Sequence, residues 1–365
     1  MKLLADIRKL ALSSLGMLAV SAFMLTACDS TIYDYEGDCD PHFKVGFRYD
    51  MNMKFVDAFS TEAKSVSLFV FDSTGKFVKS FESTVDAMAS NNYMMDVDLA
   101  PGKYSLLAWC GLNDGLHSYD VPSLTPGSST MEELKNTLKR QAADDGTAVV
   151  GEIDQLYHGI ANADFPDEEG VHIAIVPLMK DTNRVKVVLQ NLSEDSAMGV
   201  DDYKIFVTAE NGKLDYDNSL MADELLTYVP YYTQEGASEI IVTTRADEDG
   251  EAEQPASDGK QYNLLMSEMN LSRMVKNWQT PYKLHITDAD GNNIITVSLV
   301  ELFLLVKGKE NQSMDDQEYL DREDDFNMTF FLYDAGGPDE EKDTYVGAEI
   351  IINDWKIVLQ DTELN

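Results

Sequence analysis

The chain has 365 residues, enough for two domains of ordinary size, with a formal net charge of −37 at pH 7. A chain this acidic repels phosphate backbones and shows no basic stripe, which argues against nucleic-acid binding. Its 44% hydrophobic content is sufficient for packed cores and excludes a largely disordered protein.

A secretory signal opens the chain. Basic residues precede an apolar run from Leu10 to Leu25, which is short for a membrane-spanning helix. The run ends in the sequence 25–28, Leu-Thr-Ala-Cys, which resembles the bacterial lipobox, where the Cys is acylated and the chain is cut just before it. We therefore predict a lipoprotein signal peptide over residues 1–27, cleavage between Ala27 and Cys28, and lipidation of Cys28. The alternative is an ordinary secreted protein with a chance cysteine.

Two further cysteines, Cys39 and Cys110, remain. An exported protein could pair them in a disulfide. The alternative is two separate thiols, with Cys110 a small buried hydrophobe. No Cys/His spacing indicates a zinc site.

Residues 28–40 are polar and acidic, which predicts a flexible tether between the lipid and the fold. After the tether, apolar residues alternate with polar ones or form short apolar runs that turn residues separate. The strands predicted as far as residue 189 span 43–49, 66–71, 76–81, 93–99, 103–109, 171–176 and 184–189.

The rest of the chain has the same character. The predicted strands span 203–208, 228–232, 240–244, 282–287, 293–297, 326–333 and 347–359. The acidic segment 247–259 is predicted as an exposed, mobile loop. Many short strands separated by Gly and Asp turns, with few helices, indicate a mostly β protein built of β-sandwiches.

Two helices are predicted from capping boxes followed by apolar residues at helical spacing. The first begins with Ser129 and Glu132. The second begins with Ser298 and Glu301 and has Gly308 where a C-cap belongs.

No catalytic motif such as G-x-S-x-G, H-E-x-x-H or a phosphate-binding loop occurs, so neither an enzyme nor a cofactor is predicted. His158 is interpreted as a packed or capping histidine, with a functional role as the alternative. The acidic run Asp321–Asp325 lacks the pattern of a calcium loop and is interpreted as solvated charge, and Asp288–Gly291 as a turn. Trp109 and Trp355 are predicted to fill cores, with a glycan-binding platform as the alternative.

Several stretches along the chain, following the lipobox, resemble the FimB-type anchoring subunits of Bacteroidales fimbriae. They are residues 47–59 (FRYDMNMKFVDAF), 99–109 (LAPGKYSLLAW), 156–159 (LYHG), 183–190 (NRVKVVLQ), 319–324 (YLDRED) and 351–359 (IINDWKIVL).

The resemblance implies two transthyretin-like β-sandwich domains with a few short helices, over residues 41–180 and 181–365. It also implies a lipoprotein of the outer membrane, at the cell surface, that holds the base of a fimbrium and limits its length. The implied partner is a fimbrial shaft subunit, bound by strand exchange, in which a strand from one subunit completes a neighbour's sheet. The alternative function is a surface adhesin or glycan-binding lipoprotein.

Three serines are candidate sites of modification. Ser30, Ser73 and Ser196 each follow an Asp and resemble the Asp-Ser/Thr O-glycosylation motif of exported Bacteroidetes proteins.

Overall fold

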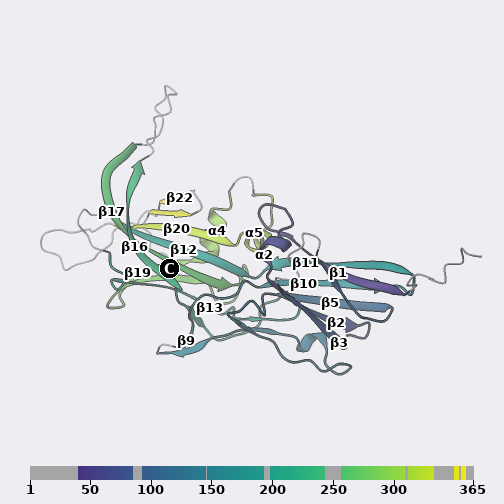
Figure 1. Cartoon of the computed structure of the whole chain (residues 1–365). Coiled ribbons are helices and arrows are strands. Elements are labelled where there is room, and N and C mark those ends of the chain that lie inside the picture. The colour runs from purple at the N-terminus through teal and green to yellow at the C-terminus, as the bar shows by residue number, and fades with distance from the viewer. Residues whose placement is uncertain are drawn as a thin grey trace, which may run out of the picture.

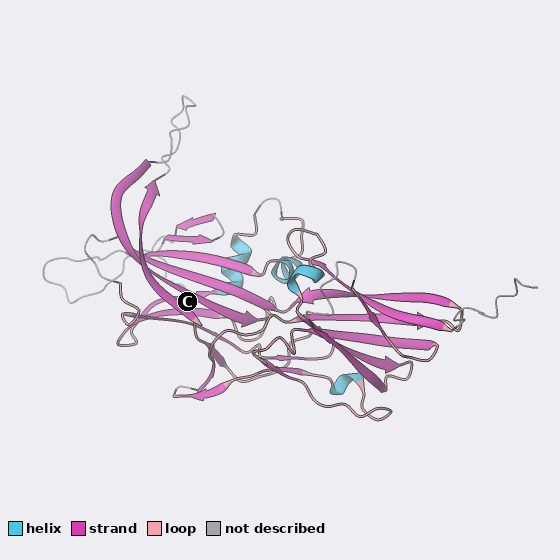
Figure 2. Ribbon diagram, viewed as in Figure 1, coloured by secondary structure: helices cyan, strands magenta, loops and turns pink. Residues whose placement is uncertain are grey.

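The computed structural model describes residues 40–84, 93–144, 146–192, 198–242, 256–308, 311–332, 349–352 and 355–358. Most of these residues form β-strands, which confirms the mostly β fold (Figure 2). Figure 1 shows an elongated molecule, with most strands of the first half at one end, strands of the second half together with β9 at the other, and short helices between them. The transthyretin-like assignment and the domain boundary at residues 180 and 181 stay predictions.

Seven strands of the first half form the N-terminal sheet. Their spatial order is β3 (Phe77–Thr84), β2 (Ser65–Asp72), β5 (Gly102–Cys110), β10 (Tyr157–Phe165), β11 (Gly170–Lys180), β1 (Pro41–Met51) and β4 (Met94–Asp96). Alternation predicts which face of β1 is buried, and Phe43, Val45, Phe47 and Tyr49 are indeed at most 6% exposed. These side chains belong to a hydrophobic cluster made within this sheet and the short helix α2 (Phe59–Glu62).

The N-terminal sheet folds over this cluster. Strands β10 and β11 share only two register pairs, Tyr157 with Lys180 and His158 with Met179. Phe43 of β1 stacks on Phe165 of β10 with 4.6 Å between ring centroids, although β11 separates these strands in the sheet order. The strands β11, β1 and β4 therefore form a second layer facing β10, β5, β2 and β3.

Two six-stranded sheets and one small sheet complete the fold. The long C-terminal sheet has the order β16 (Tyr232–Val242), β17 (Ala256–Ser272), β12 (Thr182–Asn191), β20 (Asp325–Leu332), β21 (Glu349–Ile352) and β22 (Trp355–Val358). The second C-terminal sheet has the order β19 (Asn293–Ser298), β18 (Lys283–Asp288), β13 (Tyr203–Ala209), β15 (Leu226–Tyr228), β9 (Gly146–Val149) and β8 (Gln141–Ala143). The small sheet joins β14 (Lys213–Leu214), β7 (Asn136–Leu138) and β6 (Tyr119–Asp120).

The two halves of the chain share sheets and a core. Strands β8 and β9 of the first half complete the second C-terminal sheet, and β14 of the second half completes the small sheet. One hydrophobic cluster contains Leu107 and Trp109 of the N-terminal sheet together with Val187 of β12 and Phe303 of the second half. Each half also begins with a strand that runs parallel to a late strand of the same half, β1 with β11 and β12 with β20.

The hairpin of β18 and β19 is confirmed with its turn. The Asp288 carboxylate accepts hydrogen bonds from the backbone N–H of Asn292 at 2.8 Å and from its side-chain amide at 2.7 Å. Gly291 has a φ of +89°, a conformation that favours glycine. Asp288 therefore organises a turn, as predicted from the sequence.

The helix predicted from Ser129 is wrong. The structure has only a 3-10 turn η1 (Met131–Glu133), whose capping box uses Thr130 and Glu133. Strand β7 follows at once and pairs with both β6 and β14, which buries Leu138. Apolar spacing typical of a helix is here satisfied by an extended segment, because pairing on both edges outweighs local propensity.

The helix predicted from Ser298 is confirmed as α4 (Leu299–Leu305), although the Ser298 side chain makes no capping hydrogen bond. Phe303 of α4 stacks on Phe326 of β20 at 3.7 Å between ring centroids. The structure also has α5 (Asp316–Arg322), β10 and β17, which the sequence analysis did not predict.

The loop prediction for residues 247–259 is wrong at its end. Residues 256–259 belong to β17, and Ala256 and Ser257 pair with Val242 and Ile241 of β16. Residues 247–255 lie outside the described residues. Backbone pairing of residues 256 and 257 to a neighbouring strand outweighs the polar composition of this stretch.

Candidate functional site

Most of the predicted modification sites lie outside the described residues. These are Ala27, Cys28, Ser30, Cys39 and Ser196. Their roles in signal cleavage, lipidation, glycosylation and pairing with Cys110 stay predictions.

Cys110 lies at the end of β5, fully buried in the cluster of the N-terminal sheet, and forms no disulfide with any residue that the structure describes. Burial raises the pKa of this thiol well above its ordinary value. A thiol without thiolate character is a poor nucleophile, so Cys110 packs as a small apolar side chain.

Ser73 occupies an exposed turn between β2 and β3. The Asp72 carboxylate accepts hydrogen bonds from the Thr74 hydroxyl at 2.6 Å and from the Thr74 backbone N–H at 2.8 Å. The Thr74 hydroxyl is the main reason that the pKa of Asp72 lies below its ordinary value. The turn is thus held by Asp72 and Thr74, and the Ser73 side chain is open to solvent.

His158 lies in β10 with only 5% of its surface exposed. Its Nε2–H donates to the backbone carbonyl of Tyr216 at 2.8 Å, and its ring meets Trp109 edge-on at 4.7 Å between centroids. Burial lowers the pKa of His158 to about 4, so the ring is neutral at pH 7. The packed interpretation of His158 and the core position of Trp109 agree with this geometry.

The acidic run Asp321–Asp325, interpreted from the sequence as solvated charge, is only partly exposed and is paired with basic side chains. Asp324 contacts Lys180, and Asp325 contacts Arg184 in a two-pronged pair. Lys180 and Arg184 flank residue 181, where the chain passes from the N-terminal sheet to the long C-terminal sheet. The run therefore joins the two halves of the chain.

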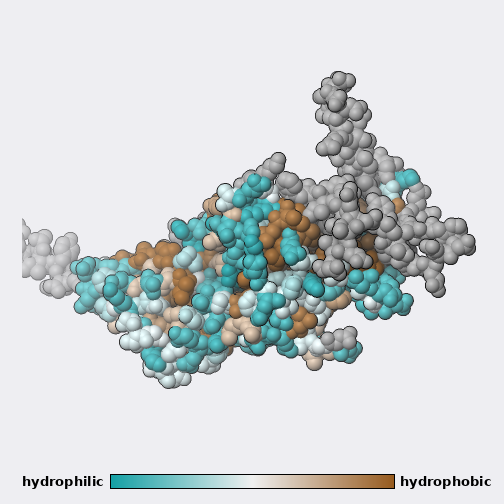
Figure 3. All heavy atoms as spheres, turned by 180° about the vertical axis from the view of Figure 1, so that it is seen from behind, coloured by the Kyte–Doolittle hydropathy of each residue, from teal (hydrophilic) through white to brown (hydrophobic). Residues whose placement is uncertain are grey.

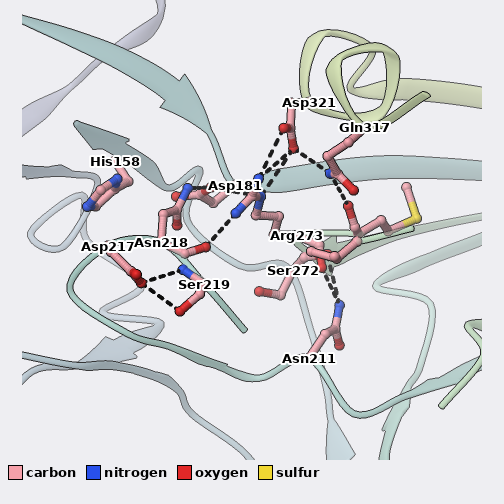
Figure 4. Close-up of polar contacts among 12 residues, drawn as sticks. His158, Asp181, Asn211, Asp217, Asn218, Ser219, Ser272, Arg273, Gln317 and Asp321 are labelled. Atoms are coloured by element: carbon pink, nitrogen blue, oxygen red, sulfur yellow. Dashed lines mark hydrogen bonds and ion pairs between the residues drawn. The ribbon is translucent and has the colours of Figure 1, made fainter. Parts of the chain in front are cut away.

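Asp321 belongs to a largely buried cluster that we call the polar junction, formed by Asp181, Asn218, Arg273 and Asp321 (Figure 4). The Arg273 guanidinium donates to both oxygens of Asp321 at 3.0 Å and to the backbone carbonyl of Asn218. Its Nε lies 4.0 Å from Asp181 Oδ1. Gln317 of α5 donates to Asp321 at 2.9 Å and completes the support of the pair.

The polar junction contains two oxygens without a hydrogen-bond donor. The Asn218 amide donates to Asp181 Oδ1 at 2.7 Å, while Asp181 Oδ2 and Asn218 Oδ1 are buried and unpartnered. Burial raises the pKa of Asp181 to about 7, against the opposing effect of Arg273. A protonated Asp181 has an O–H to donate, so protonation removes the buried charge and supplies a donor that the ionised carboxylate lacks.

Each member of the polar junction comes from a different part of the chain. Asp181 lies between β11 and β12, Asn218 in the turn after β14, Arg273 directly after β17, and Asp321 in α5. Asn218 has a φ of +67°, which asparagine tolerates. No motif in the sequence points to Arg273 or Asn218. The sequence features nearest to this cluster are the 319–324 stretch and the predicted domain boundary between residues 180 and 181.

No sign of metal chemistry or of a membrane span occurs in the part of the chain that the structure describes. No group of three or more His, Cys, Asp or Glu side chains is placed to hold a metal ion there. No helix in that part is both long and apolar enough to cross a membrane.

Strand β16 presents a free sheet edge. It is the outermost strand of the long C-terminal sheet, paired only with β17 along its length among the described strands. Residues 232–237 are exposed on both faces. No described strand pairs with the outer N–H and C=O groups of β16, and an edge of this kind can accept another strand.

Comparison with known proteins places these features in a family. Residues 35–361 match the model of a family described as fimbrillin-A associated anchor proteins Mfa1 and Mfa2. A search of curated protein sequences gives no significant match.

Several solved structures share the fold over most of the chain. A candidate adhesin from Bacteroides thetaiotaomicron is 28% identical, with a TM-score of 0.70, covering 89% of this chain and 100% of that one. A candidate polysaccharide-binding protein from the same organism is 28% identical, with a TM-score of 0.69, covering 89% and 99%. The fimbrial anchor protein Mfa2 from Porphyromonas gingivalis is 18% identical, with a TM-score of 0.58, covering 88% and 99%.

Proposed function

Because the chain belongs to the family of fimbrillin-A associated anchor proteins, we propose that it anchors a fimbrium to the outer membrane through a lipid on Cys28. The observation that carries this proposal is the family match over residues 35–361, directly after a lipobox that ends at Cys28. The family is one of structural anchor proteins, and this function requires no catalytic site.

We further propose that the chain binds a fimbrial shaft subunit by strand exchange and thereby limits fimbrial length. The free edge of β16 supports this step, because an added strand would pair with its outer backbone groups. Once the last shaft subunit is paired with the anchor in this way, no further subunit can be added at the base of the fimbrium.

Deletion of the gene tests the anchoring role. We expect fimbriae to form without the protein, because polymerisation belongs to the shaft subunits, but to be longer and to be shed into the medium. Electron microscopy of the cells and an assay of fimbriae in the medium measure both effects. Unchanged length together with unchanged attachment would refute the anchor proposal.

Complementation separates anchoring from assembly. A Cys28→Ala protein that is still exported should restore contact with the shaft subunit but leave the fimbriae unattached, since only the lipid is lost. The wild-type gene on the same vector is the matched control. Full reattachment by the Cys28→Ala protein would contradict the lipid anchor.

A second candidate function is glycan binding by a surface adhesin. It is favoured by the similarity to the candidate polysaccharide-binding protein and by a pocket of 510 Å³ over β2 and β3. The pocket is lined by apolar rings, including Phe69 and Tyr119, with His117 and Lys139 among its polar residues. Its volume is within the range of ligand pockets, about 300–1,000 Å³. Binding on a glycan array that His117→Ala abolishes would favour this function.

A further inference from the structure

Strand β11 carries a row of exposed β-branched side chains. Val171, Ile173 and Ile175 are 56%, 54% and 46% exposed and alternate along the strand, so they share one face. Val176 and Leu178, on the opposite face, are buried in the cluster of the N-terminal sheet. Among the described residues, no other strand exposes three large apolar side chains on one face. Such a patch marks a surface that contacts something other than water.

Basic side chains of β1 border this row. In the parallel register, His42 lies opposite Val171, Lys44 opposite Ile173, and Arg48 opposite Pro177. Lys44 and Arg48 each pair with a neighbouring carboxylate, Asp96 at 2.7 Å and Asp50 at 3.1 Å, and the Arg48 side chain remains 55% exposed. These two bases are offset by two carboxylates, so this part of the surface carries little net charge in a chain whose net charge is −37.

Gly46 keeps the apolar row continuous with β1. It lies opposite Ile175, and a Cβ added at Gly46 would meet Ile175 Cδ1 at 2.7 Å and Met94 Sδ at 3.0 Å. The absence of a side chain therefore lets Ile175 and Met94 lie together over β1. Hydrophobic surface runs along this end of the molecule in Figure 3.

The patch lies at the point where the chain enters the fold. β1 begins at Pro41, opposite Gly170 at the start of β11. Twelve residues, 29–40, separate Pro41 from Cys28. A fully extended chain spans about 3.5 Å per residue, so a lipid on Cys28 holds this end of the fold within about 40 Å of the bilayer.

We propose that the face formed by Val171, Ile173, Ile175 and the neighbouring basic residues of β1 rests on the lipid surface and orients the base of the fimbrium. Apolar side chains enter the headgroup region, and Lys44 and Arg48 face lipid phosphates, as at other interfacial protein surfaces. The turn between β10 and β11 carries Asp167, Glu168 and Glu169, which anionic headgroups repel. The exposed face of β11, rather than the turn that precedes it, therefore lies against the membrane. This inference rests on the proposed lipid anchor.

A fluorescent probe on the lipidated protein tests the orientation. In a Cys39→Ser background, Ile173→Cys is labelled with an environment-sensitive fluorophore, and the protein is reconstituted into vesicles of phosphatidylethanolamine and phosphatidylglycerol. Val150→Cys is the matched control, because Val150 is equally exposed at 55% and follows β9, which lies far from β11 in Figure 1. We expect the fluorescence emission of the probe at position 173 to shift to shorter wavelengths and to be quenched by brominated lipids. We expect neither effect for the probe at position 150.

The outcomes separate this inference from the anchor proposal. Protein that pellets with vesicles while its probe at 173 is neither shifted nor quenched would leave the anchor intact and overturn the membrane-facing surface. If the probe at position 173 is shielded from solvent only when purified shaft subunit is added, the face binds that partner. This result would also overturn the membrane-facing surface. Failure to pellet at all would remove the lipid anchor, and this inference with it.

Discussion

At the scale of single residues, Asp181 shows how burial determines protonation. Its side chain is fully buried, one oxygen is bonded to Asn218, and the other lacks a donor. Desolvation disfavours the charged form and outweighs the attraction of Arg273, which raises the pKa to about 7 from an ordinary value of 3.8.

This shift makes a prediction about pH. A carboxyl whose pKa is raised by folding favours the native state while it is protonated, so its contribution is lost as pH rises from about 4 to about 7. Each pKa unit corresponds to about 1.4 kcal/mol. Asp181→Asn keeps a neutral group that can donate to Asn218, so it should stabilise the protein relative to wild type increasingly between pH 4 and pH 7. Urea unfolding of both proteins across this range checks it; a difference independent of pH would contradict it.

The Arg273–Asp321 pair makes a second prediction. Their side chains are 14% and 11% exposed, so Asp321→Ala leaves a largely buried guanidinium without its carboxylate. Breaking such a pair costs about 3–5 kcal/mol of unfolding free energy. The control is Asp325→Ala, whose pair with Arg184 is 41–45% exposed and should cost less than about 1 kcal/mol. Chemical denaturation of the two variants gives the comparison, and equal losses would show that burial does not matter here.

At the scale of elements, the free edge of β16 determines where a strand can be added. N–H groups along an edge strand point alternately toward its neighbour and away from it. Of two adjacent residues, one therefore donates toward β17 and the other toward solvent. Gly236 and Ala237 are both exposed positions in this strand.

We predict that Gly236→Pro and Ala237→Pro behave differently. Proline at the position that donates to β17 should lower the melting temperature, because it removes a ladder hydrogen bond. Proline at the other position should leave the melting temperature nearly unchanged but weaken binding of the shaft subunit. Thermal unfolding and pull-down of the shaft subunit measure the two effects. Normal binding by both variants would exclude β16 as the accepting edge.

At the scale of the whole molecule, the shared sheets and core couple the two halves. Strands β8, β9 and β14 pair across them, and Trp109 shares one hydrophobic cluster with Phe303. We therefore predict that the halves unfold in a single cooperative transition.

Two core substitutions test this coupling. Val45→Ala lies in the cluster within the N-terminal sheet and Val187→Ala in the cluster shared by both halves. Each should lower the midpoint of the same urea transition, seen identically by tryptophan fluorescence and circular dichroism. Two separate transitions, each moved by only one substitution, would show independent halves.

Local patterns by themselves were sufficient for the class of fold and most strands. The alternation of Phe43, Val45, Phe47 and Tyr49 depends only on which face of a strand is buried, and the structure buries that face. The Asp288–Gly291 turn needs only neighbouring residues. The lipobox ending at Cys28 is likewise local, and the prediction of lipidation depends on it alone.

The tertiary structure decided everything that depends on partners far along the chain. The extended form of residues 136–138 follows from pairing with β6 and β14, which helical spacing around Ser129 does not reveal. The polar junction joins Asp181 to Asn218, Arg273 and Asp321, residues that only the fold brings together. Among the residues that the structure describes, the same fold leaves the outer edge of β16 unpaired and the apolar face of β11 exposed. Sequence pattern records how each residue relates to its near neighbours, whereas burial, charge pairing and free edges depend on contacts that exist only after the chain has folded.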